Sequence, residues 1–181
     1  MGNSLVSPLL PDILDTFERS AGAAGPLVAA ASLPGIFLAP IIGFAADRWG
    51  RRPILTLCLI VFGCGGLFTA ISPNFTILVA TRFLLGIGSA GLINLGVVLI
   101  GDHFDGEERT TWIGRNAAML TVGLAIIPLV SGVIGEFFSW RIATLGYSLG
   151  FVSAAYAWRV LRDEPSRTPQ RLKSQLSGVG T

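Results

Sequence analysis

The chain is 181 residues long, with 51% hydrophobic and 13% charged residues and a formal net charge of +2. Soluble domains contain about one quarter charged residues, so this composition excludes a soluble globular domain and indicates a chain surrounded mostly by lipid. Its basic residues are spread over several short loops, which argues against nucleic-acid binding.

Apolar runs of membrane-spanning length follow one another along the chain. A helix needs about 20 apolar residues to cross a bilayer, where lipid leaves backbone polar groups no other partner. Five runs meet this requirement, at residues 26–45, 54–71, 77–101, 117–136 and 142–160. A shorter run at 1–13 is interpreted as the outer half of a first helix whose beginning is missing. Residues 1–161 are therefore predicted to form an all-α integral membrane bundle of six helices, and the polar residues 162–181 a cytoplasmic linker or the start of a loop.

The charged residues predict the orientation of this bundle. Ten of the 13 basic residues fall on one side of the six helices, whereas Arg19 and Arg141 fall on the other. The positive-inside rule makes the basic side cytoplasmic. Trp112 and Trp158 are expected at the inner membrane interface, and Trp140 at the outer one, as members of an aromatic belt.

A charged turn, GFAADRWGRR at residues 43–52, separates the first two full spans. Asp47 lies at the C-terminal end of a helix, where the helix dipole is negative and disfavours an acid. We therefore expect a positive group to compensate: Arg51 or Arg52 reaching back, or the N-terminus of another helix.

Two interpretations of this turn stay open. It could be a solvated loop in which Asp47, Arg48 and the other charges balance. The alternative is a conformational latch, which forms when this side of the protein is closed and breaks when it opens. We favour the latch because Gly43 and Gly50 permit close helix packing and a tight turn at the same place.

Arg82 lies within the run at 77–101. A charge at membrane depth costs about 2.5 kcal/mol or more unless it faces water or a partner. Arg82 could extend to the outer interface, or it could face a cavity and bind an anionic group or respond to proton movement. Gly86 and Ala90 follow at intervals of four residues, so this helix face is smooth and can pack closely.

Small residues and a proline mark the run at 117–136 and the turn before it: Gly114, Gly123, Pro128, Ser131 and Gly132. Neighbouring helices tolerate such residues in a membrane, where they shape a kink or a close crossing. Ordinary small-residue packing is the simpler interpretation of this pattern. Asn3, Asn94 and Asn116 are candidates for side chains that point into a cavity.

The turn at residues 43–52 resembles the signature loop between helices two and three of the major facilitator superfamily: Gly, three residues, Asp, Arg, one residue, Gly, Arg, Arg. The resemblance implies that this loop helps to lock the inner gate of a transporter. It implies that Asp47 faces a helix of the transporter's second half. It also implies that Arg51 pairs with an acid at the inner end of helix four, which by position is Asp102.

Two further segments resemble motifs of the same family. RFLLGIG, which starts at Arg82 and contains Gly86, resembles a helix-four motif tied to proton coupling, with Leu85 where the family often has Gln. The helix-one motif of drug–proton antiporters is matched by three spaced residues: Gly2, Pro8 and Pro11.

The helix-five motif of proton-driven exporters is resembled by the spacing of four residues: Gly114, Gly123, Pro128 and Gly132. Ile127 and Ser131 stand where glycine is usual in that motif. Ser131 is still small, so close packing survives, whereas the bulky Ile127 leaves uptake open beside export.

Transporters of this superfamily have twelve helices in two halves, with the substrate between them near the membrane midplane. The resemblance therefore implies an N-terminal half with an incomplete first helix, which needs the missing half or a second copy as its partner. It implies a multi-pass protein of the plasma membrane that exports small amphipathic compounds in exchange for protons. Uptake of sugars or organic anions, and a non-transporting membrane partner, are the alternatives. The residues suggest no enzyme, cofactor or metal site.

Overall fold

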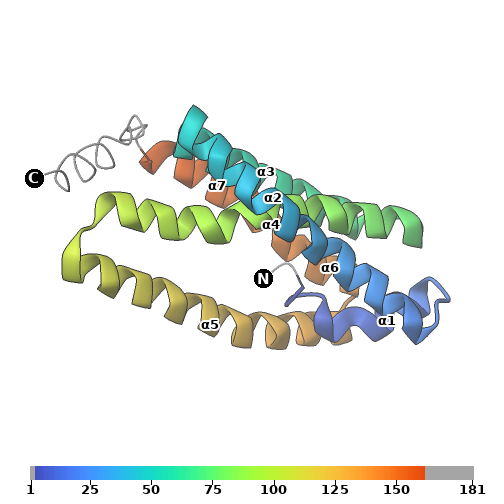
Figure 1. Cartoon of the computed structure of the whole chain (residues 1–181). Coiled ribbons are helices and arrows are strands. Elements are labelled where there is room, and N and C mark those ends of the chain that lie inside the picture. The colour runs from blue at the N-terminus through green and yellow to red at the C-terminus, as the bar shows by residue number, and fades with distance from the viewer. Residues whose placement is uncertain (1–2, 162–181) are drawn as a thin grey trace, which may run out of the picture.

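The computed structural model describes residues 3–161, whose regular structure is entirely helical. Four long helices run along the bundle (Figure 1): α2 Ala24–Trp49, α3 Arg51–Ala70, α4 Phe75–His103 and α5 Gly106–Phe137. Each is long and apolar enough to cross a membrane. The all-α membrane bundle that the sequence predicts is thus confirmed. Gly2 and the expected linker at 162–181 lie outside the described residues.

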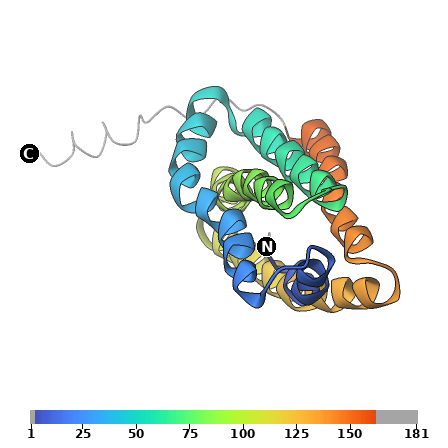
Figure 2. The same ribbon diagram turned by 90° about the vertical axis from the view of Figure 1, so that its right-hand side faces the viewer.

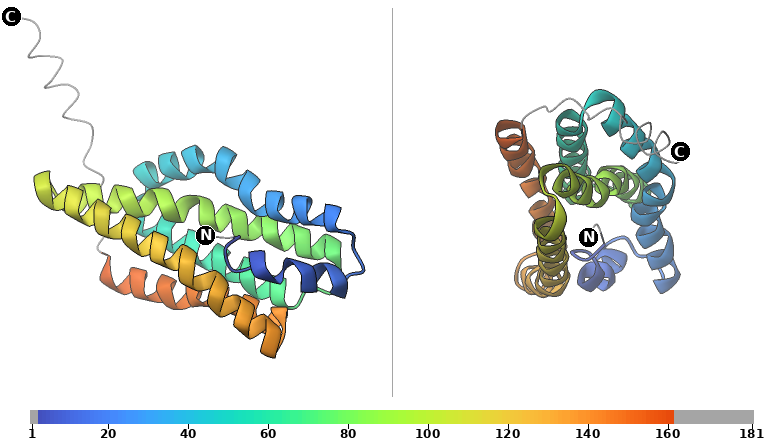
Figure 3. Two further views of the ribbon diagram at one scale, coloured as in Figure 1. Left: turned by 90° about the horizontal axis from the view of Figure 1, so that it is seen from below. Right: turned by 60° about the vertical axis from the view of Figure 1, so that its left-hand side comes forward.

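Helix α4 lies at the centre of the bundle, packed against α2 and α3 (Figure 2, and the right-hand view in Figure 3). Its glycines allow neighbouring backbones to approach where a side chain would otherwise stand. A Cβ on Gly86 would lie 2.6 Å from the carbonyl oxygen of Ala31 on α2, and a Cβ on Gly88 would lie 2.5 Å from the backbone nitrogen of Phe62 on α3. Small residues are typical of membrane-helix interfaces, because lipid gives helices no hydrophobic reason to associate.

The helix expected at residues 142–160 is interrupted. The chain forms three consecutive segments there: α6 Trp140–Thr144, the 3-10 turn η3 Leu145–Ser148 and α7 Leu149–Val160. The prediction of one continuous helix is therefore wrong. Tyr147 fills the space beside Gly66 of α3, and Gly150 packs against the carbonyl oxygen of Leu59. A 3-10 turn is tighter than an α-helix and changes the direction of the side chains that follow, which allows both close contacts with α3.

The N-terminal segment forms short helices: η1 Ser7–Leu9, α1 Leu10–Thr16 and η2 Ala21–Ala23. It lies beside α5 (Figure 3, left). Leu9 and Ile13 are buried in the core, and Pro8 lies 3.6 Å from where a Cβ on Gly132 would stand. Helix α5 packs against few other elements, and this short segment is one of them.

Polar contacts tie the bundle together at the end near Trp140. The Trp140 ring is buried, and its indole N–H donates to Oγ1 of Thr16 at 3.0 Å, so it packs in the core at this end and does not face the lipid as a member of an aromatic belt would. Arg141 donates to the carbonyl oxygens of Ala70 at 2.7 Å and Ser72 at 3.0 Å. Helix α3 leaves its last carbonyls without a helical partner, and Arg141 satisfies the one of Ala70, its last residue, together with that of Ser72 just beyond the helix.

The opposite end carries the charged turn, and we call it the basic end. Helices α2, α4 and α7 end there, and α3 and α5 begin there (Figure 1). This arrangement brings Arg51 and Arg52 into the same region of the molecule as Arg109 and Arg159, which lie far from them in sequence.

Candidate functional site

The turn between α2 and α3 consists of a single residue, Gly50, which caps both helices. Its φ is 96°, in the left-handed region that glycine adopts at little steric cost. The turn places Asp47, near the end of α2, four residues before Arg51, the first residue of α3. A side chain at position 50 would strain this connection.

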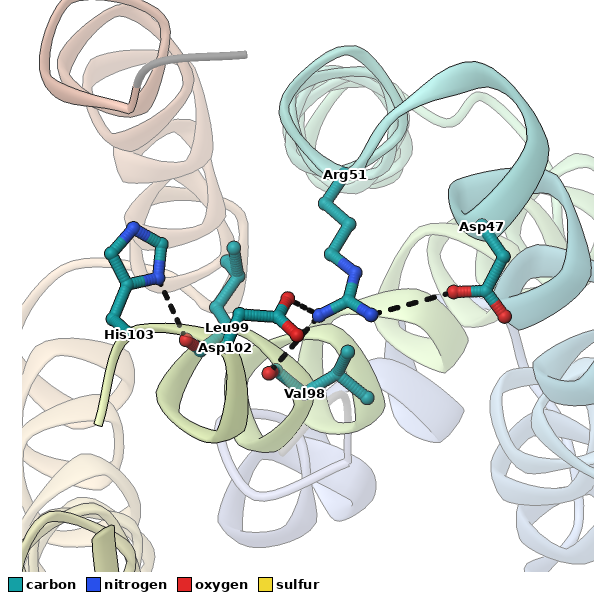
Figure 4. Close-up of polar contacts among 6 residues, drawn as sticks. All are labelled: Asp47, Arg51, Val98, Leu99, Asp102 and His103. Atoms are coloured by element: carbon teal, nitrogen blue, oxygen red, sulfur yellow. Dashed lines mark hydrogen bonds and ion pairs between the residues drawn. The ribbon is translucent and has the colours of Figure 1, made fainter. Parts of the chain in front are cut away.

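Figure 4 shows the guanidinium of Arg51 between two carboxylates. Nη1 forms an ion pair with Asp102 near the end of α4 and donates to the carbonyl oxygen of Val98 at 3.2 Å. Nη2 lies 3.5 Å from Oδ1 of Asp47. One side chain therefore joins the ends of α2 and α4 to the start of α3, and the pairing with Asp102 that the family resemblance implies is present.

Helix dipoles explain why a cation suits this place. Asp47 and Asp102 lie near helix C-termini, where the dipole is negative and a carboxylate is disfavoured. Arg51 faces both carboxylates and the C-terminal end of α4. The side-chain exposure is 22% for Arg51, 38% for Asp102 and 67% for Asp47. Water therefore screens these ion pairs, and each is worth about 0–1 kcal/mol, weak enough to form and break.

The other residues of the turn have separate positions. Arg52 contacts α7: its Cζ lies 4.2 Å from the centroid of the Trp158 ring, and it donates to the Trp158 carbonyl oxygen. Of the two arginines expected to compensate Asp47, Arg51 is the one that reaches it. Arg48 is exposed. A Cβ on Gly43 would meet open space within the described residues, so the close packing expected of Gly43 is not found there.

Arg82 is fully buried in the bundle. Its Nη1 donates to the hydroxyl oxygen of Tyr147 at 3.3 Å, and its Cζ lies 5.6 Å from that ring's centroid. Its Nε and Nη2 have no hydrogen-bond partner within residues 3–161. The interpretation in which Arg82 extends to the membrane interface is therefore wrong. A buried cation with unpaired donors is costly, and inside a membrane such a residue indicates a functional site.

A polar hollow of about 280 Å³ lies between α2 and α4. Its polar lining comes from Asn3, Ser32, Ser89 and Asn94, and the Asn3 amide donates to Oγ of Ser32 at 2.9 Å. Asn3 and Asn94, two of the three asparagines proposed to face a cavity, thus lie at one hollow. Asn116, on α5, does not line it.

The small residues of α5 have mixed environments. Ser131 is buried and donates to the carbonyl oxygen of Pro128 at 3.1 Å, and Gly132 faces Pro8 of the N-terminal segment. The remaining motif residues of this helix and of α1 are half-buried or exposed: Gly114, Gly123 and Pro11. The packed part of the α5 motif is therefore its C-terminal portion, which rests on the first segment of the chain.

Sequence analysis missed Tyr147 and Ser32 as members of these sites. A tyrosine in an apolar run is itself a signal, because a buried Tyr hydroxyl usually finds a hydrogen-bond partner. The hydrogen bond between Arg82 and Tyr147 joins residues 65 positions apart, and no periodic pattern in the sequence connects them. Within residues 3–161, no three His, Cys, Asp or Glu side chains lie together as metal ligands do.

The chain is a multi-pass helical membrane protein. It has apolar helices of spanning length, a weak charged contact at one end and a buried arginine. The family model of the Major Facilitator Superfamily matches residues 1–179. The chain belongs to this superfamily, whose members are transporters.

Individual relatives include a resistance protein and an exporter. The chain is 36% identical over 140 residues to the tetracycline resistance protein, class B, of Escherichia coli, a match that covers 75% of the chain and 34% of that protein. It is 28% identical over 145 residues to the bacillibactin exporter of Bacillus subtilis (strain 168), covering 76% of the chain and 36% of the exporter. The chain thus spans about a third of the length of these relatives.

The fold also matches a solved structure. The human organic anion transporter MFSD10 (TETRAN) superposes with a TM-score of 0.71 at 21% sequence identity, over 90% of this chain and 44% of that one. At this low identity the match shows the fold alone.

Proposed function

We propose that the chain forms half of a secondary active transporter that exports small amphipathic compounds in exchange for protons. The observation that carries this proposal is the Arg51 contact set, which joins three helix ends by interactions weak enough to break. The similarity to the bacillibactin exporter supports the direction of transport. The resemblance of the segments around Arg82 and Pro128 to antiporter motifs supports proton coupling.

Each site has a role in this proposal. Alternating access works by rocking one half of a transporter against the other. Asp47, Arg51 and Asp102 hold the basic end closed in one state and separate in the other. Arg82 responds to proton movement, because the energy of its buried charge changes when a group near it gains or loses a proton. The hollow beside Asn94 contacts part of the substrate.

The partner and the membrane follow from the same proposal. A second half, or a second copy of this chain, supplies the helix that Asp47 faces. The basic end lies in the cytoplasm and the protein lies in the plasma membrane, which the excess of arginine at that end supports through the positive-inside rule. Residues 162–181 then lie on the cytoplasmic side.

Uptake of an organic anion is a second candidate. It is favoured by one observation, the buried guanidinium of Arg82 with two nitrogens that lack partners within the described residues. Such a group would bind a carboxylate or phosphate strongly once water is excluded. The direction of transport separates the two candidates.

Everted membrane vesicles test this function directly. They would be prepared from cells that produce the gene product at its natural full length, and acidified inside by respiration. We expect neutral and cationic amphipathic dyes to accumulate, and a protonophore to abolish the accumulation.

Proton-driven accumulation of organic anions in right-side-out vesicles instead would favour uptake. No flux of either kind, together with specific cross-linking to another membrane protein, would indicate a non-transporting partner. If the partner is a separate second half, vesicles containing only the 181-residue chain should show no flux.

A further inference from the structure

A groove of about 530 Å³ lies between α3 and α7 near the basic end. Thr56 and Ile60 of α3 line one wall, and Phe151, Ala155 and Trp158 of α7 line the other. Helix α7 packs mainly on α3 at the edge of the bundle, away from α4 (Figure 2). Ile60 is 40% exposed and Trp158 is 48% exposed. The groove therefore opens outward from the bundle, on the side where a spanning helix meets lipid.

The open end of this groove is positively charged. Arg159 lines it and is exposed, and Arg52 brings a second guanidinium against Trp158. Among residues 3–161, no acid lines the groove, and Arg159 forms no ion pair with any of these residues. The acids Asp47 and Asp102 of this end are engaged by Arg51 instead.

We infer that this groove binds one anionic phospholipid, with an acyl chain along Ile60 and Phe151 and the phosphate on Arg159. An apolar channel that ends in an arginine and a tryptophan matches the order of groups in a lipid at the membrane interface. Tryptophan favours the headgroup level, and arginine pairs with phosphate through two parallel hydrogen bonds. Basic pockets between spanning helices are known places for anionic headgroups.

The groove lies apart from the polar hollow between α2 and α4, and lipid binding there does not require transport. Arg52, at the start of α3, already holds the end of α7 through Trp158. A lipid in the groove adds a second connection between the same two helices. Membrane composition would then influence how firmly α7 is held next to the charged turn.

Quenching of Trp158 fluorescence by brominated lipids tests the inference on the purified 181-residue chain in vesicles. Trp49→Phe and Trp112→Phe remove the other tryptophans of the basic end, and Trp140 is buried at the far end. Brominated phosphatidylglycerol and brominated phosphatidylcholine would be titrated separately into unlabelled phosphatidylcholine. We expect phosphatidylglycerol to quench at a several-fold lower mole fraction, since one arginine near the membrane surface contributes about fivefold in affinity for anionic lipid.

Arg159→Gln should remove this preference, whereas the control Arg115→Gln, an exposed arginine of α5 that does not line the groove, should retain it. An unchanged elution volume in size-exclusion chromatography shows that each variant remains folded. Equal quenching by the two lipids, or an undiminished preference in Arg159→Gln, would overturn the inference. Loss of the preference on adding soluble glycerol phosphate would assign the charge to a free-anion site and would also overturn it.

Discussion

Arg51 and Asp102 form an ion pair that connects the first residue of α3 to the end of α4 (Figure 4). The same guanidinium reaches the Val98 carbonyl and Asp47, so the loss of one side chain would release the ends of two neighbouring helices. Because all three charged groups are partly exposed to water, the set contributes little to folding stability. Contacts this weak suit a switch better than a permanent structural link.

A double-mutant cycle on this ion pair tests its strength. Arg51→Gln, Asp102→Asn and the double variant of the purified chain would be unfolded in detergent by heat or denaturant. We expect a coupling free energy of about 0.2–1 kcal/mol, as for other solvent-exposed pairs. The exposed Arg48, combined as Arg48→Gln with Asp102→Asn, should give additive effects. A loss of about 3 kcal/mol or more in either single variant would instead mark a buried, permanent bridge.

Substitution of Arg82 separates its structural role from its functional role. Arg82→Met keeps a long side chain and removes a buried charge whose Nε and Nη2 lack partners within residues 3–161. Replacing a buried ion pair with apolar groups is often neutral or stabilising by about 1–4 kcal/mol, and a buried cation with unpaired donors is costly, so we expect the unfolding temperature to be kept or raised. In the natural full-length protein, proton-driven transport should be lost. Unchanged transport would contradict the proposed coupling role, and unfolding of the variant would contradict the expected stability.

The central position of α4 depends on Gly86. Gly86→Ala would place a methyl group 2.6 Å from the Ala31 carbonyl oxygen, and overpacking of this kind costs about 1–3 kcal/mol. Gly43→Ala is the matched control, because a Cβ there meets open space and alanine favours a helix over glycine by about 0.5–1 kcal/mol. Thermal unfolding in detergent should therefore move in opposite directions for the two variants. Equal shifts would show that the α2–α4 contact is not close.

The spanning helices could be predicted from the sequence because lipid imposes a simple length and composition on them. Their ends could not be predicted as well. The apolar run at residues 117–136 belongs to α5, which begins at Gly106, and the run at 26–45 belongs to α2, which continues to Trp49. Hydropathy locates the part of a helix that lies in lipid, whereas backbone hydrogen bonds continue into the polar interface.

The prediction failed where tertiary packing decided the local structure. At the break, Tyr147 of η3 packs beside Gly66 of α3, and these residues belong to different spans. Trp140 looked like an interface residue because it stands beside a polar loop, but a hydrogen bond to Thr16 and burial place it in the core. The Arg51–Asp102 pair could be anticipated only through the family resemblance, since spacing alone does not reveal which helix ends meet.

The most direct test of the latch is the transport rate of Asp47→Asn in the natural full-length protein. Asp47 is 67% exposed, so the substitution should change folding stability by no more than about 0.5 kcal/mol and leave the amount in the membrane unchanged. We predict that proton-driven accumulation in everted vesicles falls severalfold, because the closed state of the basic end loses a charge that Arg51 engages. Asp105→Asn, at the nearby start of α5, should transport normally. Undiminished transport by Asp47→Asn at equal expression would contradict the latch.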